Sequence, residues 1–242
     1  MGQSQTIPLQ PPDEKLDVVF EVFAQAVLHA SQKLKQYLGF VDPQQTLRVS
    51  TCTLNAVFLI HFINFCKEKG VDGCISTRAM TRQQEMLMGV SWIWTLTCSS
   101  RISEFQIAVR SVQTSGTYRV TEMDEDPYQK RLEQSISDLD RNKSCFDKLF
   151  DFSSSIGVNC MSLYIVYGLP GKPREIRGVL SKDLLRFKAG ESGSFTEEML
   201  LRYLRSADTF ITTTEMIQNH LWKQSRSSDS DSEHVYVYIN FL

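Results

Sequence analysis

The residues best suited to bind a metal ion are spaced too widely to form a recognised zinc motif. The chain contains six cysteines and four histidines: Cys52, Cys66, Cys74, Cys98, Cys145 and Cys160, and His29, His61, His220 and His234. No two cysteines form a C-x-x-C pair, and no histidines form an H-E-x-x-H motif. The spacing predicts no metal site, and cysteines dispersed through apolar stretches are typical of a reducing, cytosolic compartment.

Motifs that activate a nucleophile or bind phosphate are also absent. The chain has no G-x-S-x-G, no kinase motif and no G-x-G-x-x-G. Residues 168–173 contain a Gly-Lys pair, but a P-loop would require glycine at Val166 and serine or threonine at Pro173. We therefore expect a turn at 168–173, no catalytic residues, no cofactor and no enzymatic activity. Pairs of cysteine and histidine, or of carboxylates, that only the fold brings together stay open.

Composition excludes further classes of protein. The 242 residues include 26 Lys+Arg and 28 Asp+Glu, a formal net charge of −2, and 42% are hydrophobic. Without an excess of positive charge the sequence argues against a nucleic-acid-binding protein. The longest apolar run, residues 56–66, is shorter than the ~20 residues that a membrane-spanning helix needs.

The N-terminus carries a lipidation pattern. The first six residues, Met-Gly-Gln-Ser-Gln-Thr, match M-G-x-x-x-[ST], which predicts myristoylation of Gly2 after removal of Met1. The polar, proline-containing stretch 1–12 is expected to be a flexible acylated tail that attaches the protein to a membrane. We expect no secretory signal, because the first 14 residues contain no Lys or Arg and no apolar segment. The alternative is an unmodified tail.

Near the other end, Ser228 and Ser230 each precede an acidic residue by three positions. This pattern fits an acid-directed kinase site as well as it fits an unmodified solvated loop.

Apolar spacing predicts four helices in the first half of the chain. They are expected over residues 13–38, 53–69, 81–96 and 102–116. The second is apolar nearly all round, which is typical of a central core helix. The third begins with a capping box formed by Thr81 and Gln84 and continues through Trp92 and Leu96.

The second half is expected to combine helices and strands. We predict an acidic connection at 115–127, helices at 128–139 and 144–156, strands at 161–167, 176–180 and 234–241, two or three short helices within 181–222, and a Ser/Asp loop at 225–233. Thr212 and Glu215 form another capping box. The fold class is α+β, with a predominantly helical first half and helices around a small sheet in the second half. Residues 13–242 are expected to form a single domain.

Two apolar clusters could lie either in the core or at a binding surface. The Trp92 and Trp94 pair is assigned to the core, since such stripes usually face inward. Phe146, Leu149 and Phe150 lie on one side of a predicted helix whose neighbours are charged, which is typical of a protein-binding surface surrounded by polar groups. The alternative is that these three residues are core.

Five segments carry a resemblance to a known family. They are residues 29–40, 53–72, 92–95, 146–149 and 167–179. Together they resemble the Rab-fifteen effector family, named for the small GTPase that its members bind. Residues 116–127 and 225–233 depart from the family pattern.

The resemblance implies a non-enzymatic effector at the cytoplasmic face of early and recycling endosomes, with a cytosolic pool. It would bind the GTP-bound form of Rab-fifteen, and Rabs of the Rab-three group, and regulate recycling of the transferrin receptor. We predict that Phe146, Leu149 and Phe150 contact the Rab. The alternative function is a membrane-tethered adaptor that is indifferent to the nucleotide.

Overall fold

The computed structural model describes residues 12–44, 46, 49–97, 104–114, 131, 134–135, 143–188, 195–225 and 236–241. The helices are α1 (Pro12–Leu34), α2 (Thr51–Glu68), α3 (Arg82–Met88), α5 (Cys145–Ile156), α6 (Ser181–Lys188), α7 (Glu197–Ser206) and α8 (Thr213–Ser225). The strands are β1 (Ile75–Ala79), β2 (Trp92–Leu96), β3 (Phe105–Gln113), β4 (Cys160–Leu169), β5 (Lys172–Leu180), β6 (Thr209–Ile211) and β7 (Val237–Asn240).

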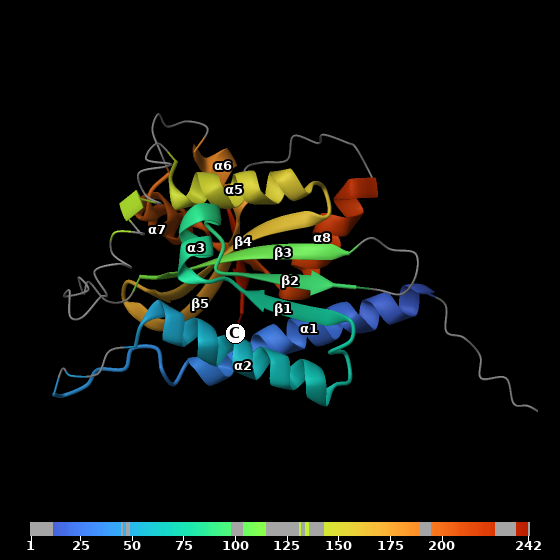
Figure 1. The fold of residues 1–242 in the computed structure, drawn as a ribbon, viewed down its shortest axis with the longest axis horizontal. Coiled ribbons are helices and arrows are strands. Elements are labelled where there is room, and N and C mark those ends of the chain that lie inside the picture. Colours follow the sequence, from blue (N-terminus) through green and yellow to red (C-terminus); the bar gives the residue numbers. More distant parts are fainter. Residues whose placement is uncertain are drawn as a thin grey trace, which may run out of the picture.

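The strands form one mixed sheet in the order β1-β2-β3-β4-β5-β7-β6 (Figure 1). Strands β3 and β4 are parallel, with Ile107 beside Met161, and α5 lies on the chain between them. Strands β6 and β7 are also parallel, whereas the other neighbouring pairs are antiparallel. A parallel pair needs a crossover, and α5 belongs to the crossover between β3 and β4.

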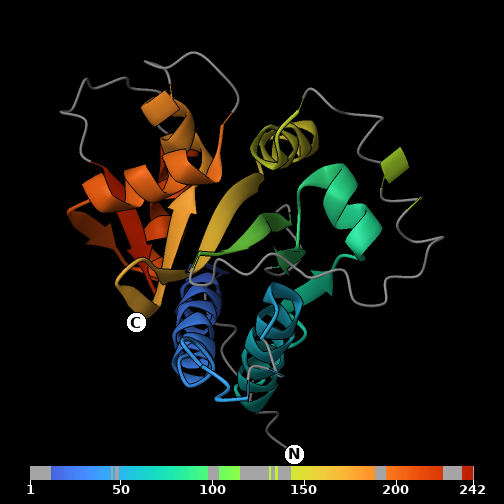
Figure 2. The same cartoon turned by 90° about the vertical axis from the view of Figure 1, so that its left-hand side faces the viewer.

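Helices cover both faces of this sheet, as Figure 2 shows. Helices α1 and α2 pack on one face together with Met216 and Ile217 of α8. Side chains of α5, α6 and α7 form a second hydrophobic cluster on the other face. Strand β4 is buried along its whole length because its alternate residues serve the two clusters.

The first cluster contains an aromatic core between the two long helices and β2. Phe23 of α1, Phe62 of α2 and Trp94 of β2 contact one another, with ring centroids 5.0–5.4 Å apart. Trp92 lies 5.4 Å from Trp94 at 77°, an edge-on arrangement that aromatic pairs favour. Both tryptophans are fully buried, which confirms their assignment to the core.

Several elements that were predicted from short sequence patterns are confirmed. Thr81 and Gln84 form the expected capping box at the start of α3. Thr212 and Glu215 exchange the corresponding bonds before α8, where the Thr212 N–H donates to Glu215 at 2.7 Å. These bonds to the Glu215 carboxylate lower its pKa. The β4–β5 hairpin and the last strand, β7, are also present.

Of the four helices predicted in the first half, the third was predicted to extend too far and the fourth was wrong. Helix α3 ends at Met88, because Gly89 adopts a left-handed conformation with φ of 70°, and the predicted continuation through Trp92 and Leu96 is β2. The helix predicted from residue 102 is β3 from Phe105 onward. The first half therefore supplies three strands to the sheet, while the α+β class is confirmed.

Other predictions lie outside the described residues. They concern the acylated tail with Gly2, the acidic connection at 115–127, most of the helix predicted at 128–139, and the loop with Ser228 and Ser230. All of these stay predictions.

Candidate functional site

The three residues predicted to contact a partner occupy different environments on α5. Leu149 is fully buried in the second hydrophobic cluster. Phe146 is half-buried and packs on Tyr164 and Phe195, with centroid distances of 4.3 and 4.0 Å. Phe150 has 38% of its surface exposed. The three side chains therefore do not share one exposed face, and Phe150 is the one most available to a partner.

Replacing Leu149 with alanine is expected to destabilise the fold by about 2–5 kcal/mol, because it leaves a cavity in a closely packed cluster. Phe150→Ala should change the free energy of unfolding by less than about 1 kcal/mol. Urea unfolding of both variants measures the difference. An unchanged unfolding midpoint for Leu149→Ala would show that this side chain is not part of the core.

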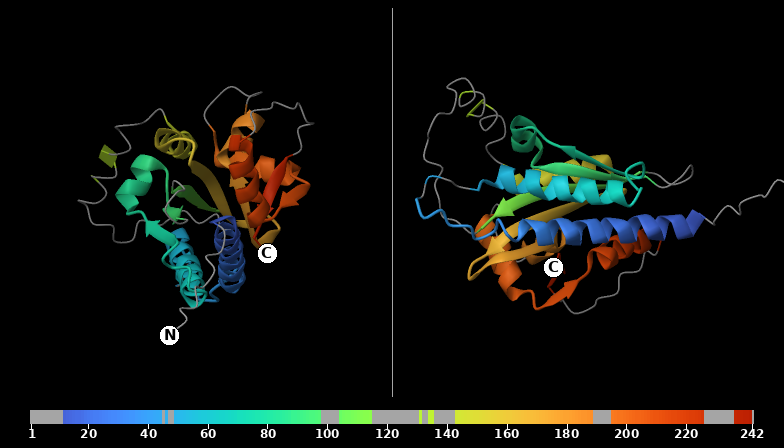
Figure 3. Two further views of the ribbon diagram at one scale, coloured as in Figure 1. Left: turned by 90° about the vertical axis from the view of Figure 1, so that its right-hand side faces the viewer. Right: turned by 90° about the horizontal axis from the view of Figure 1, so that it is seen from below.

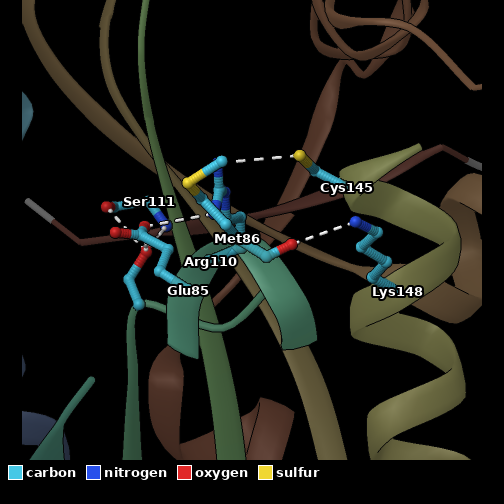
Figure 4. A network of polar contacts seen from close by, with 7 residues as sticks. Glu85, Met86, Arg110, Ser111, Cys145 and Lys148 are labelled. Carbon is cyan, nitrogen blue, oxygen red and sulfur yellow. Dashed lines mark hydrogen bonds and ion pairs between the residues drawn. The ribbon is translucent and has the colours of Figure 1, made fainter. Parts of the chain in front are cut away.

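A polar network joins α3 to β3 and α5 (Figure 4). The Arg110 guanidinium pairs with Glu85 at 3.1 Å, and the Ser91 hydroxyl donates to the same carboxylate oxygen. The Ser111 N–H donates to Ser91 Oγ at 3.1 Å. From α5, Lys148 Nζ donates to the carbonyl of Met86 at 3.0 Å, and Cys145 Sγ lies 3.9 Å from Arg110 Nη2.

The network is suited to hold elements together rather than to activate a nucleophile. The Ser91 hydroxyl donates to Glu85, and the charge of that carboxylate is already paired with Arg110. The three described histidines lie elsewhere, on α1, α2 and α8, so none of them can act here as a general base. We infer that the polar network holds α3, β3 and α5 together.

A cavity of about 720 Å³ lies beside the polar network. Its lining includes Met86, Arg110, Cys145, Tyr164 and Phe195. The Tyr164 hydroxyl has no hydrogen-bond partner among the described residues, and burial raises its pKa.

Burial also raises the pKa of the Cys66 and Cys160 thiols to about 12 and about 11. These two thiols are therefore protonated at neutral pH and are poor nucleophiles.

Within the described residues, no cluster of three or more side chains is suited to hold a metal ion. Among the same residues, no helix has the length and hydropathy needed to span a bilayer.

The outward sides of α1 and α2 carry exposed apolar residues. The two helices run side by side across one face of the sheet (Figure 3). The exposed residues are Val18 and Leu28 of α1, and Ile60 and Ile63 of α2, which together we call the outer face. Helix α2 was predicted to be a central core helix, and this was wrong: one side packs on the sheet, while Ile60 and Ile63 are 56% and 45% exposed.

Comparison with known proteins identifies the family. A family model described as Rab15 effector matches residues 3–241. The chain belongs to the Rab15 effector family. A mouse (Mus musculus) protein named "Rab15 effector protein" is 33% identical over 240 residues, covering 99% of this chain and all of that relative. The match to the Rab15 effector family runs through residues 116–127 and 225–233, the two stretches that depart from the expected pattern.

Sequence reasoning missed the outer face of this Rab15 effector family member. The signal was available, because residues 51–66 contain no Lys, Arg, Asp or Glu. An uncharged stretch of that length indicates burial, and the sequence does not tell whether the fold or a partner covers it. The structure covers only one side.

Proposed function

We propose that this protein binds Rab15 in its GTP-bound form and acts as an effector, without a chemical step of its own. The observation that carries the proposal is the family match over residues 3–241, supported by a full-length relative named for Rab15. GTP orders the switch segments of a small GTPase through its γ-phosphate and Mg²⁺. A protein that docks on ordered switch segments therefore binds the GTP form more tightly than the GDP form.

We further propose that the protein acts at the cytoplasmic face of early and recycling endosomes, where it regulates recycling of the transferrin receptor. The family resemblance supports this location and cargo. The pattern at residues 1–6 supports attachment through an acyl chain on Gly2. Rabs of the Rab-three group are proposed as additional partners on the same resemblance.

The prediction that Phe146, Leu149 and Phe150 contact the Rab has not been tested. A substitution of Phe150 would test it best, because this side chain is the most exposed of the three. Leu149 is buried and Phe146 is half covered. A Rab could contact Phe150 and the exposed part of Phe146 directly, whereas it could contact Leu149 only if α5 moved away from the sheet.

Retention on immobilised Rabs tests the proposed function. Rab15, a member of the Rab-three group and an unrelated Rab are each loaded with a non-hydrolysable GTP analogue or with GDP. We expect the full chain to be retained by GTP-loaded Rab15 and to wash off the GDP-loaded form. Equal retention in both nucleotide states would instead indicate the nucleotide-independent adaptor. No retention by any Rab would contradict the proposal.

A further inference from the structure

The cavity beside the polar network is lined by several buried polar groups that lack a partner. Seven buried side-chain polar atoms have no hydrogen-bond partner among the described residues, and three of these atoms belong to residues that line this cavity. They are Oδ1 of Asn55 on α2, Nε1 of Trp92 on β2 and the hydroxyl of Tyr164 on β4. Buried polar groups are normally hydrogen-bonded, because leaving one unpaired destabilises the fold. Three such groups around one cavity point to a bound molecule with polar atoms.

The cavity also has the size and the position of a small-molecule site. Its volume of about 720 Å³ lies within the range of ~300–1,000 Å³ that is typical of such sites. Trp92 belongs to the first hydrophobic cluster and Tyr164 to the second, so side chains from both layers of the fold contribute to the lining. A ligand in this cavity would therefore contact both layers.

One wall of the cavity consists of aromatic rings. Phe146 stacks on Tyr164, with the ring planes 21° apart and the centroids separated by 4.3 Å, and Phe195 lies 4.0 Å from Phe146. Met86 lines the same cavity, and a thioether also makes favourable contacts with aromatic rings. Aromatic rings pack well on one another in stacked and edge-on arrangements. The wall is therefore better suited to a flat aromatic ligand than to a branched aliphatic one.

The charges around the cavity favour an uncharged ligand. Four charged residues are among the described residues that line it: Arg82, Glu85, Arg110 and Glu197. Glu85 and Arg110 neutralise each other through their ion pair at 3.1 Å (Figure 4). Arg82 and Glu197 are exposed, which places them towards solvent. An ionised ligand would lose its hydration beside the aromatic wall without gaining an unpaired opposite charge there, which is unfavourable.

We propose that this cavity binds a small, uncharged aromatic molecule that carries a hydroxyl or carbonyl group. The ring of the ligand packs against Phe146 and Phe195, and its oxygen accepts a hydrogen bond from the Tyr164 hydroxyl. Burial raises the pKa of Tyr164, so this hydroxyl keeps its proton at neutral pH and can donate it. Asn55 Oδ1 offers an acceptor and Trp92 Nε1 a donor to a second polar group. The inference does not depend on Rab binding.

Three related probes test the chemical class of the ligand on the full chain. They are 2-naphthol, naphthalene and 2-naphthoate, which share two fused aromatic rings and differ in a hydroxyl group or a negative charge. Fluorescence titration measures the affinity of each probe. We expect the wild type to bind 2-naphthol about fivefold more tightly than naphthalene, as one neutral hydrogen bond provides. It should bind 2-naphthoate most weakly.

Two tyrosine variants locate the binding site. Tyr164→Phe removes the hydroxyl and keeps the ring. Tyr167→Phe is the matched control, because the Tyr167 hydroxyl is also buried without a partner among the described residues, but Tyr167 packs in the first cluster and is not among the described residues that line the cavity. Tyr164→Phe should lose the fivefold preference for 2-naphthol, whereas Tyr167→Phe should keep it. Neither variant should have a lower melting temperature, since each removes a buried polar atom that lacks a partner.

Each other outcome would overturn the proposal. If 2-naphthol shows no saturable binding up to its solubility limit, the cavity does not bind this class of molecule. Equal affinities for 2-naphthol and naphthalene would mean that water, rather than a ligand, pairs with Tyr164. Equal losses in the two tyrosine variants would place the effect in the fold as a whole. A lower melting temperature for Tyr164→Phe alone would show that its hydroxyl has a partner within the protein, and tightest binding of 2-naphthoate would contradict an uncharged ligand.

Discussion

Replacing Trp94 with alanine is expected to lower the free energy of unfolding by about 3–5 kcal/mol. Trp94 is fully buried and contacts the rings of Phe23, Phe62 and Trp92, so its removal opens a cavity that joins α1, α2 and β2. The surrounding helices cannot collapse into this space without losing their own contacts with the sheet. Chemical unfolding followed by circular dichroism measures the change.

Trp94→Phe makes the test specific to packing. The indole N–H of Trp94 is buried without an acceptor among the described residues, and a buried donor that lacks a partner costs about 1–3 kcal/mol. Phenylalanine removes that donor while it keeps most of the ring contacts. We therefore expect Trp94→Phe to destabilise the protein by less than half as much as Trp94→Ala. Equal losses for the two variants would contradict the packing account of this core.

Gly2→Ala is expected to abolish most of the membrane attachment of the protein. A single myristoyl chain binds membranes with a constant of only about 10⁴ M⁻¹, so stable attachment needs a second signal. Residues 1–14 contain no Lys or Arg, and no cysteine precedes Cys52, so the tail offers neither a polybasic segment nor a site for a second acyl chain. We propose that the GTP-bound Rab, itself lipid-anchored, is the second signal.

Fluorescence imaging of the tagged protein measures this dependence. Gly2→Ala should become largely cytosolic while the purified variant still binds the Rab normally. Gln3→Ala is the matched control, since it keeps the M-G-x-x-x-[ST] pattern. Wild type should also disperse when the Rab is locked in its GDP form. Persistence of Gly2→Ala on endosomes in cells without the Rab would contradict the two-signal hypothesis.

The elements that were predicted correctly are those whose signal lies within a few residues. A capping box requires only a side chain and the backbone three positions away, so those at Thr81 and Thr212 could be identified without tertiary information. Strand β4 was identified because a run rich in β-branched and aromatic residues suits a strand that is buried on both faces.

The helix predicted from residue 102 was wrong because the spacing of its apolar residues is consistent with both a helix and a strand. Phe105 and Val109 are four residues apart, which places them on one face of a helix and equally on one face of a strand. Ile107 between them is buried too, and this resolves the ambiguity in favour of β3. The prediction that α2 is a central core helix was wrong for a different reason. A helix without charged residues is expected to be largely buried, but the sequence does not show which of its sides packs against the rest of the chain. Only the three-dimensional structure shows this.

The affinity of the full chain for Rab15 in its two nucleotide states tests the central claim most directly. Calorimetric titration against Rab15 loaded with a GTP analogue and then with GDP measures both constants under the same conditions. If the protein docks on GTP-ordered switch segments, the GTP-loaded form should bind about 100-fold more tightly, since the nucleotide changes the population of the competent surface. Affinities that agree within about twofold would mean that the protein does not sense the nucleotide, and would contradict its assignment as an effector.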